Sequence, residues 1–299
     1  MFLRLTYALV ILIWATTPLS IKLGGETLAP IAGLTLRIAL AFTVGCTLST
    51  LAGWSGLAIR RNWKLYFAAS ISVFPNMALV YLASRYLPSG VIALMFGLSP
   101  FFTAVLALPI LGENLLQPRK LLAIALAGVG LVLILLDDVT IGAEGKIGFG
   151  LMMLSNLLFS GSALWVKKLN ATMSVEPFEQ ALGAMAFALP GLFLSWVYLF
   201  GVEPLHFSAV SLTSLLYLAL VASLIGFVAY YHILKHLAVE TVALIPLISP
   251  VMAIAVGVVV AGETVTAAML AGAGLILTGL ALHQGLLGIK STRSPAAGG

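Results

Sequence analysis

The chain has 299 residues, of which 61% are hydrophobic and only 8% are charged. Its mean hydropathy is +1.14. A soluble domain of this length carries about a quarter charged residues, so the composition excludes a soluble globular protein and predicts an integral membrane protein. The net charge of +5 does not indicate a nucleic-acid partner, because the basic residues lie in short loops between apolar runs.

Ten apolar runs follow one another along the chain, and a helix needs roughly 20 such residues to cross a membrane. The first run is interpreted as a retained span rather than a signal peptide, because no small-residue cleavage site follows it. Residues 288–299 are small and polar and are predicted to be a disordered tail. The predicted spans are 3–22, 30–51, 65–86, 90–111, 120–136, 147–166, 178–199, 210–234, 240–261 and 265–284.

The basic residues predict how these spans are oriented. With the N-terminus in the cytoplasm, most of the 15 Lys and Arg residues fall on the cytoplasmic side, and only Lys22, Arg85 and Lys146 fall on the outer side. Cytoplasmic loops of membrane proteins are enriched in Lys and Arg. We therefore expect a multi-pass protein of the plasma (inner) membrane, embedded in the lipid bilayer with both termini in the cytoplasm.

The second half of the chain repeats marks of the first half at a fixed offset. Tyr81 matches Tyr231, Arg85 matches Lys235, Ser99-Pro100 matches Ser249-Pro250, and Gly112-Glu113 matches Gly262-Glu263. Each repeated unit holds five spans, and an odd number makes the second unit enter the membrane from the opposite side. The predicted fold class is an all-α integral membrane protein with ten transmembrane helices, in two inverted five-helix repeats over 1–143 and 144–287. Inverted repeats are typical of carriers for small molecules.

The paired prolines are the sharpest indication of a site. Pro100 and Pro250 fall near the middle of the fourth and ninth spans, where a proline lacks an N–H and frees the carbonyl four residues earlier, at Phe96 and Pro246. Inside a bilayer such carbonyls must face protein or a water-filled cavity. Matched breaks in two halves predict a binding site at the membrane midplane. The alternative is a packing kink satisfied by the adjacent serines.

Polar and aromatic residues near mid-membrane extend this candidate site. Asn76 and Asn156 either face a cavity or bridge two helices, since an unpaired amide in lipid is costly. Trp14 either lines a cavity or packs in the core, whereas Tyr230 is interpreted as an interface residue. The predicted substrate-binding residues are Trp14, Asn76, Tyr81, Phe96, Ser99, Asn156, Pro246 and Ser249.

A second set of residues is predicted to act in gating or structure. Arg37 lies inside the second span, where it is expected to pair with Glu26 or with helix-end carbonyls. Glu113 and Glu263 are expected to cap helix N-termini or to form gate contacts. Pro100 and Pro250 complete the set. No Asp or Glu lies at mid-depth, which argues against a buried-acid proton relay, and no cofactor or metal site is predicted.

Glycine pairs mark the fifth and tenth spans, at Gly128-Val129-Gly130 and Gly272-Ala273-Gly274. Small residues let helix backbones approach closely, so these spans are expected to form a scaffold or the contact of a homodimer. A nucleotide-binding loop is excluded, because the pattern lies inside a membrane span with no strand before it.

Together these marks resemble the drug/metabolite transporter superfamily in its EamA-like branch, over about residues 5–284. They are Trp14 followed by Lys22, Pro30 followed by Arg37, Arg85-Tyr86-Leu87-Pro88, both Ser-Pro and both Gly-Glu pairs, and the glycine-rich fifth and tenth spans. The sequence departs from the family pattern at Ala15, where glycine is usual, and at 236–240, which is more polar than usual. The resemblance implies a central cavity lined by spans one, three, four, six, eight and nine, and export of metabolites such as amino acids.

Three classes of function follow. The first is a carrier that works by alternating access, with a neutral or zwitterionic small solute that has an apolar part. The second is a channel or a passive scaffold, although channels usually show repeated polar rings that this chain lacks. The third is an intramembrane serine enzyme, but Leu158 stands where a Gly-x-Ser-Gly pattern around Ser160 needs glycine. The carrier is the prediction, and the protein is not expected to be an enzyme.

Overall fold

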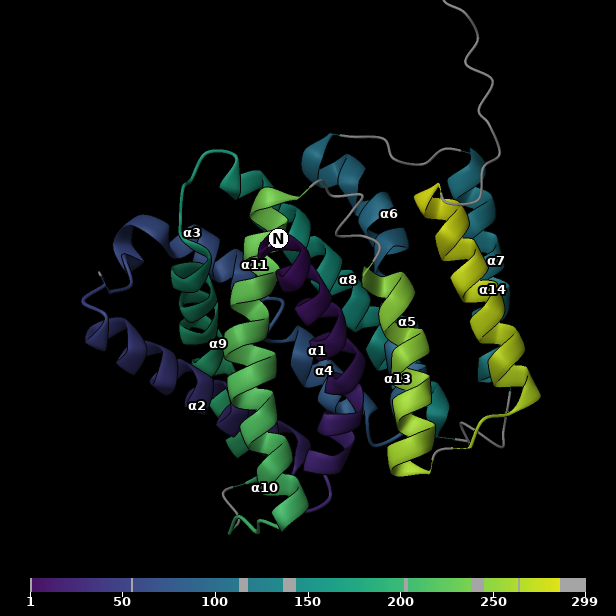
Figure 1. Cartoon of the computed structure of the whole chain (residues 1–299), viewed down its shortest axis with the longest axis horizontal. Helices are drawn as coiled ribbons and strands as arrows, with labels where there is room; N and C mark the ends of the chain where they lie inside the picture. Colours follow the sequence, from purple (N-terminus) through teal and green to yellow (C-terminus); the bar gives the residue numbers. More distant parts are fainter. Residues whose placement is uncertain are drawn as a thin grey trace, which may run out of the picture.

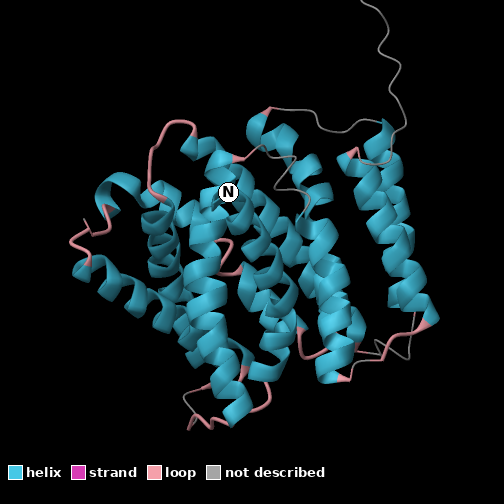
Figure 2. Cartoon of the chain, viewed as in Figure 1, coloured by secondary structure: helices cyan, strands magenta, loops and turns pink. Residues whose placement is uncertain are grey.

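A computed structural model describes residues 2–54, 56–112, 118–136, 144–201, 204–237, 245–262 and 264–285. Every regular element in these ranges is a helix (Figure 2), which confirms the all-α prediction for this part of the chain. The elements are α1 (Phe2–Gly24), α2 (Pro30–Leu51), α3 (Ile59–Ser70), α4 (Asn76–Ala83), α5 (Ser89–Phe96), α6 (Ser99–Leu111), α7 (Pro118–Leu135), α8 (Gly145–Asn170), α9 (Pro177–Phe200), α10 (Ala209–Leu216), η1 (Tyr217–Ile225), α11 (Gly226–His236), α13 (Ile245–Ala261) and α14 (Ala267–Gln284). The predicted tail at 288–299 lies outside the described residues.

Six helical segments are long and apolar enough to cross a membrane, and they fall on six of the predicted spans. They are Leu3–Gly24, Pro30–Leu51, Ser89–Ile110, Gly145–Asn170, Pro177–Phe200 and Ala209–His236. Two shorter apolar helices, Leu121–Ile134 and Ala267–His283, fall on the predicted fifth and tenth spans. The protein is therefore a helical membrane protein that crosses the bilayer several times.

The third predicted span is not one continuous helix. It consists of α3 and α4, which a short turn over 71–75 separates. Pro75 ends this turn, and a proline both lacks an N–H donor and disfavours the helical conformation of the residue before it, Phe74. The apolar run at 65–86 was predicted as one helix, whereas the structure interrupts it before Pro75.

The eighth predicted span continues without a gap through α10, η1 and α11, and η1 has the wider π-type turns. Turns of this kind are rare and occur often at functional sites. In this chain η1 carries Ala222, which lines the candidate site described below. It also carries Ser223, whose hydroxyl accepts a hydrogen bond from Arg37 in that site.

The helices form one bundle (Figure 1), and most of the contacts between different helices join helices that are not consecutive in the sequence. On one side of the bundle α2 packs against α9 and η1, and α3 also packs against α9. In the middle α1 packs against α13 and α11, and α8 packs against α4 and α6. At the opposite edge α7 and α14 form a close pair.

Glycines set the close approach of α7 and α14. A Cβ atom placed on Gly130 would lie 2.5 Å from the carbonyl oxygen of Gly272, and one on Gly279 would lie 2.6 Å from that of Ala123. A Cβ on Gly128 or Gly274 meets nothing within 4 Å. Gly130 and Gly272 therefore serve the contact between α7 and α14 within one chain. A homodimer contact through these helices would have to use their other faces, which carry Gly128 and Gly274.

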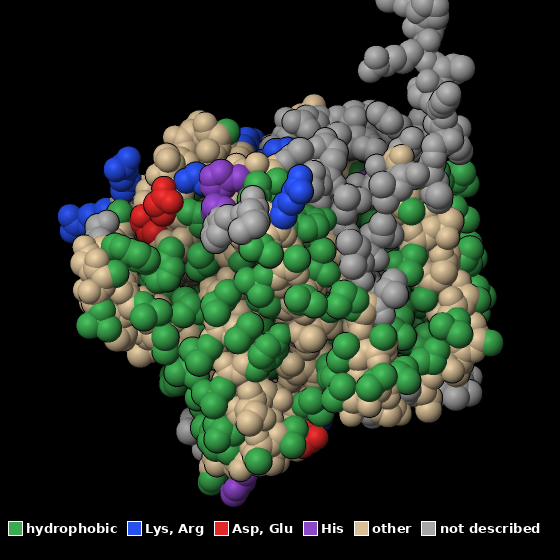
Figure 3. Space-filling view, in the orientation of Figure 1, with side chains coloured by type: hydrophobic (Ala, Val, Ile, Leu, Met, Phe, Trp, Pro, Cys, Tyr) green, Lys and Arg blue, Asp and Glu red, His purple; other side chains and the backbone are tan. Residues whose placement is uncertain are grey.

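The outer surface is apolar around the middle of the bundle. Large hydrophobic side chains are widely exposed on α9 and α13, among them Tyr198 at 89%, Val259 at 83% and Leu194 at 67%. On the face shown in Figure 3, Lys and Arg side chains gather near one end of the helices, and hydrophobic side chains cover most of the middle. An apolar belt between polar ends is the surface expected of a protein surrounded by lipid.

Candidate functional site: a central cavity

A small cavity of about 80 Å³ lies between helices from both halves of the chain. We call it the central cavity. Helices α1, α2, α4, α5, α6, α8, η1, α11 and α13 and the turn between α3 and α4 supply its walls. The lining residues are Trp14, Thr17, Pro18, Arg37, Ser72, Met77, Ala93, Phe96, Ser99, Phe159, Ala222, Phe227, Tyr230 and Ser249.

The cavity brings together several residues singled out in the sequence. Trp14, Phe96, Ser99 and Ser249 line it, although they come from four different helices, and Arg37 lines it as well. The two serines of the repeated Ser-Pro marks therefore face one common space. Their side chains are almost fully buried, each with 6% exposure.

Three aromatic rings form one wall of the central cavity. The ring centroids of Trp14 and Tyr230 lie 5.3 Å apart, and Phe159 lies 6.1 Å from Trp14 and 6.3 Å from Tyr230. Edge-to-face and tilted pairs at these distances are favourable. The interpretation of Tyr230 as an interface residue was wrong, because its side chain is only 7% exposed and faces the cavity. Phe159 and Phe227 were missed, since a phenylalanine in an apolar run carries no signal of the face it occupies.

Asn76 and Asn156 lie behind the cavity wall rather than in its lining, and both are fully buried. The Asn76 amide donates to the carbonyl of Ser72 at 2.9 Å and accepts from the Ser155 hydroxyl at 2.6 Å. The Asn156 amide donates to the carbonyls of Met95 at 2.9 Å and Met152 at 3.0 Å. In this arrangement each amide joins α8 to a neighbouring helix, which is the helix-bridge alternative.

The break between α5 and α6 precedes Pro100, which occupies the first turn of α6. Side chains of α8 satisfy the carbonyls around the break: Asn156 donates to Met95, and the Ser160 hydroxyl donates to the carbonyl of Ser99 at 2.9 Å. Ser160 is therefore engaged with the backbone, which does not favour a nucleophilic role for it. In the second half the predicted matching break was wrong, because α13 continues as one helix through Pro246 and Pro250. The Ser249 hydroxyl donates to the carbonyl of Ile245 at 3.0 Å, which is the kink satisfied by the adjacent serine.

Arg37 is the buried charge of the central cavity, with 2% of its side chain exposed. Its Nε donates to the Ser223 hydroxyl at 2.7 Å, and its Nη1 donates to the Tyr81 hydroxyl at 3.3 Å. The guanidinium carbon also lies 6.0 Å from the centre of the Tyr81 ring. Tyr81 thus contacts Arg37 and does not itself line the cavity. The expected pairing with Glu26 was wrong, because Glu26 is exposed at the end of the first helical hairpin and makes no ion pair with Arg37.

Glu113 and Glu263 lie outside the described residues. The glycine before each of them is described, and both glycines end a helix with a left-handed backbone, Gly112 with φ of 75° after α6 and Gly262 with φ of 62° after α13. Glycine is favoured at this position because it has no Cβ.

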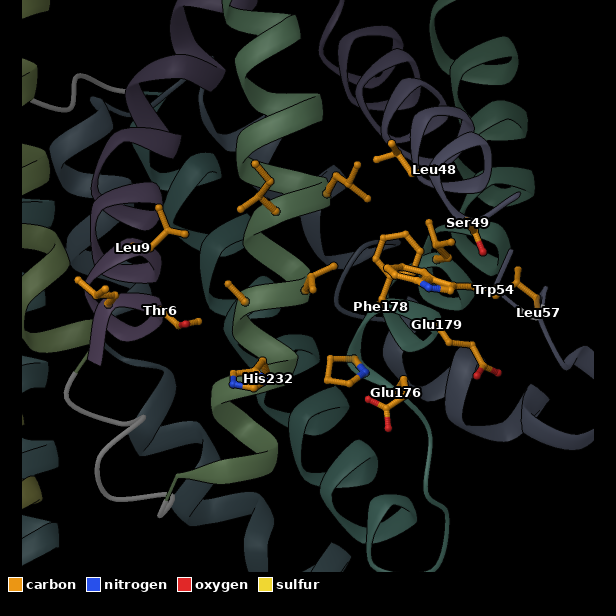
Figure 4. A pocket seen from close by; sticks show the side chains of 17 residues that line it. Thr6, Leu9, Leu48, Ser49, Trp54, Leu57, Glu176, Phe178, Glu179 and His232 are labelled. Atoms are coloured by element: carbon orange, nitrogen blue, oxygen red, sulfur yellow. The ribbon is translucent and has the colours of Figure 1, made fainter. Parts of the chain in front are cut away.

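A second and larger hollow is a groove of about 890 Å³ between α1, α2, α9 and α11 (Figure 4). Its walls are mostly apolar, with Leu9 on α1 and Leu48 on α2. At one end Glu179 accepts hydrogen bonds from the Asn62 amide at 2.8 Å and from the Tyr66 hydroxyl. Apolar walls of this kind suit lipid chains, whereas the central cavity combines aromatic rings, hydroxyls and one buried charge, so we take the central cavity as the candidate site.

Comparison with known proteins places the chain in a family. The EamA-like transporter family matches residues 3–136 and 146–283. A "Probable amino-acid metabolite efflux pump" of Salmonella typhimurium is 28% identical over 97% of each chain, and one of Escherichia coli is 27% identical over 92% of each chain. "Protein PecM" of Dickeya dadantii is 26% identical over 74% of this chain and 73% of its own.

The fold also matches a solved crystal structure with a TM-score of 0.66, over 94% of this chain and 95% of that one, at 19% identity. The family match covers nearly the whole chain, in two blocks. The chain therefore belongs to the EamA-like transporter family and is a membrane transporter, which confirms the resemblance found in its sequence.

Proposed function

We propose that the protein is a secondary transporter that exports small organic solutes related to amino acids across the plasma membrane, by alternating access at the central cavity. The observation that carries this proposal is the cavity itself, where Ser99 of the first half and Ser249 of the second half face one buried space lined by aromatic rings. The names of the relatives from Salmonella typhimurium and Escherichia coli support amino-acid metabolites as the solutes and export as the direction.

The packing of the helices supports two inverted repeats of five helices each. If α1 corresponds to α8, and α13 to α5 and α6, then the packing of α1 on α13 has its counterpart in that of α8 on α6. In the same scheme α2 corresponds to α9, α3 to η1, and α4 to α11. The packing of α3 on α9 then has its counterpart in that of η1 on α2. The packing of α4 on α8 has its counterpart in that of α11 on α1. Two halves related in this way can rock about a site between them, which is how carriers with inverted repeats work.

The small volume of the cavity fits an occluded state. Sites for small organic ligands usually have about 300–1,000 Å³, and the central cavity has about 80 Å³. Binding therefore requires the halves to separate on one side and the aromatic side chains to move. The excess of Lys and Arg on one side of the predicted topology supports an inward-facing N-terminus.

Filling the cavity tests this proposal. Ser99→Trp and Ser249→Trp each add a large ring to the shared space, so we expect each to reduce solute efflux from cells at least tenfold. The protein should remain in the membrane at near wild-type abundance. Ser174→Trp serves as the matched control, since Ser174 is exposed in the loop between α8 and α9. Wild-type efflux by both cavity variants would place the site elsewhere.

A further inference from the structure

Arg37 is the one side chain with a formal charge among the described residues that line the central cavity. The remaining lining residues are apolar, aromatic or hydroxyl-bearing, and none of them is an Asp or Glu. A charge buried in a membrane protein is costly and is usually paired with an opposite charge. Within the described ranges Arg37 has neutral partners, the hydroxyls of Ser223 and Tyr81.

These hydroxyls orient the guanidinium without neutralising it. A guanidinium presents five N–H donors in a planar fork, and the hydrogen bonds to Ser223 and Tyr81 engage its Nε and Nη1. Its Nη2 has no hydrogen-bond partner in the part of the chain that the structure describes. A carboxylate matches this fork, because its two oxygens accept parallel N–H bonds. The missing counter-ion is therefore expected in the ligand.

The rest of the lining defines the other end of such a ligand. Trp14, Phe159 and Tyr230 form an aromatic wall that suits an apolar or aromatic group. An ammonium group finds no carboxylate among the described lining residues, so a zwitterion would leave the cavity with a net positive charge. An anion would leave it neutral.

From these observations we propose that the central cavity selects monocarboxylate anions with an apolar or aromatic body and no free ammonium group, such as amino acids whose nitrogen is acylated. Arg37 holds the carboxylate. This inference rests on the proposed transport function, and it replaces two expectations from the sequence, the neutral or zwitterionic solute and the structural or gating role of Arg37.

The charge of the solute also bears on the direction of transport. A membrane potential that is negative inside drives an anion outward, with an equilibrium ratio of roughly 50-fold for each 100 mV. Export of a monocarboxylate by this cavity therefore needs no proton relay. The predicted spans contain no mid-depth Asp or Glu that could supply one.

Four probes with one aromatic body test the inference in proteoliposomes at neutral pH. N-acetylphenylalanine is an anion, phenylalanine a zwitterion, phenylalaninamide a cation and N-acetylphenylalaninamide neutral. We expect the wild-type protein to transport N-acetylphenylalanine at least tenfold faster than each of the other three. Arg37→Gln should abolish this preference, and Arg37→Lys should retain part of it. Arg85→Gln is the matched control, because Arg85 is exposed in the turn that follows α4.

The outcomes separate the inference from the proposed function. If phenylalanine or the neutral amide is transported as fast as N-acetylphenylalanine, the protein is a carrier and the inference is wrong. The inference is also wrong if folded Arg37→Gln protein keeps the preference for the anion. If folded wild-type protein transports none of the four, the proposed function fails for solutes of this class, and the inference fails with it. The comparison among probes in the wild-type protein does not depend on whether any variant folds.

Discussion

Replacing Gly130 or Gly272 by alanine is expected to destabilise the protein by more than about 2 kcal/mol, because each new methyl group would push α7 away from α14. The nearest atoms are backbone carbonyl oxygens, at 2.5 Å from the added Cβ in both cases, so the helices themselves must move. Overpacking of a well-packed contact costs about 1–3 kcal/mol, and a backbone obstacle leaves little room for relaxation. The loss of folded protein on heating in detergent measures this effect.

The neighbouring glycines provide the control. Gly128→Ala and Gly274→Ala add the same methyl group in the same two helices, where nothing lies within 4 Å. Alanine is favoured over glycine in helices by up to about 1 kcal/mol, so these variants should be as stable as the wild type or slightly more so. Equal melting temperatures for all four variants would show that α7 and α14 do not approach as described.

The second large effect is expected at Asn156, which satisfies the carbonyl of Met95 at the end of α5. Asn156→Leu removes this hydrogen bond and the one to Met152, and it leaves the Met95 carbonyl near the helix break with backbone donors alone, among them the Leu98 N–H at 3.0 Å. Hydrogen bonds between membrane helices contribute about 0.6 kcal/mol on average and up to about 1.7 kcal/mol. We expect a loss near the upper value, seen as lower abundance and a lower melting temperature.

Asn170→Leu is the matched substitution at the exposed C-terminal end of the same helix, and it should leave the melting temperature unchanged. If Asn156→Leu protein melts like the wild type but no longer transports, then Asn156 contacts the solute as predicted from the sequence, and its bridging role is secondary.

Much of the architecture could be predicted because composition and repetition act over long stretches of chain. Runs of about 20 apolar residues have few alternatives to membrane helices, and the repeated Ser-Pro marks indicated that Ser99 and Ser249 belong to equivalent places. Trp14 and Phe96 were also predicted near that space, and both line the central cavity. These predictions needed only the depth of a residue in its span.

The remaining features depended on which face of a helix a residue occupies, and depth alone cannot show this. Asn76 points to Ser155 and Asn156 to Met95, so both amides join helices behind the cavity wall. Tyr230 lies at a depth that suits an interface residue, yet the packing of α11 beside α1 turns it toward Trp14. The role of Arg37 likewise became clear only when its neighbours proved to be neutral.

Counterflow in proteoliposomes tests the central claim most directly, because it distinguishes a carrier with alternating access from a channel. Vesicles with purified protein are loaded with an unlabelled solute and diluted into a trace of the labelled one, across a panel of amino acids and their N-acylated derivatives. With the membrane potential clamped at zero, we predict transient accumulation of label for at least one solute, and none with Ser249→Trp protein. Label that only equilibrates across the membrane, or accumulation that Ser249→Trp leaves unchanged, would contradict transport by alternating access at the central cavity.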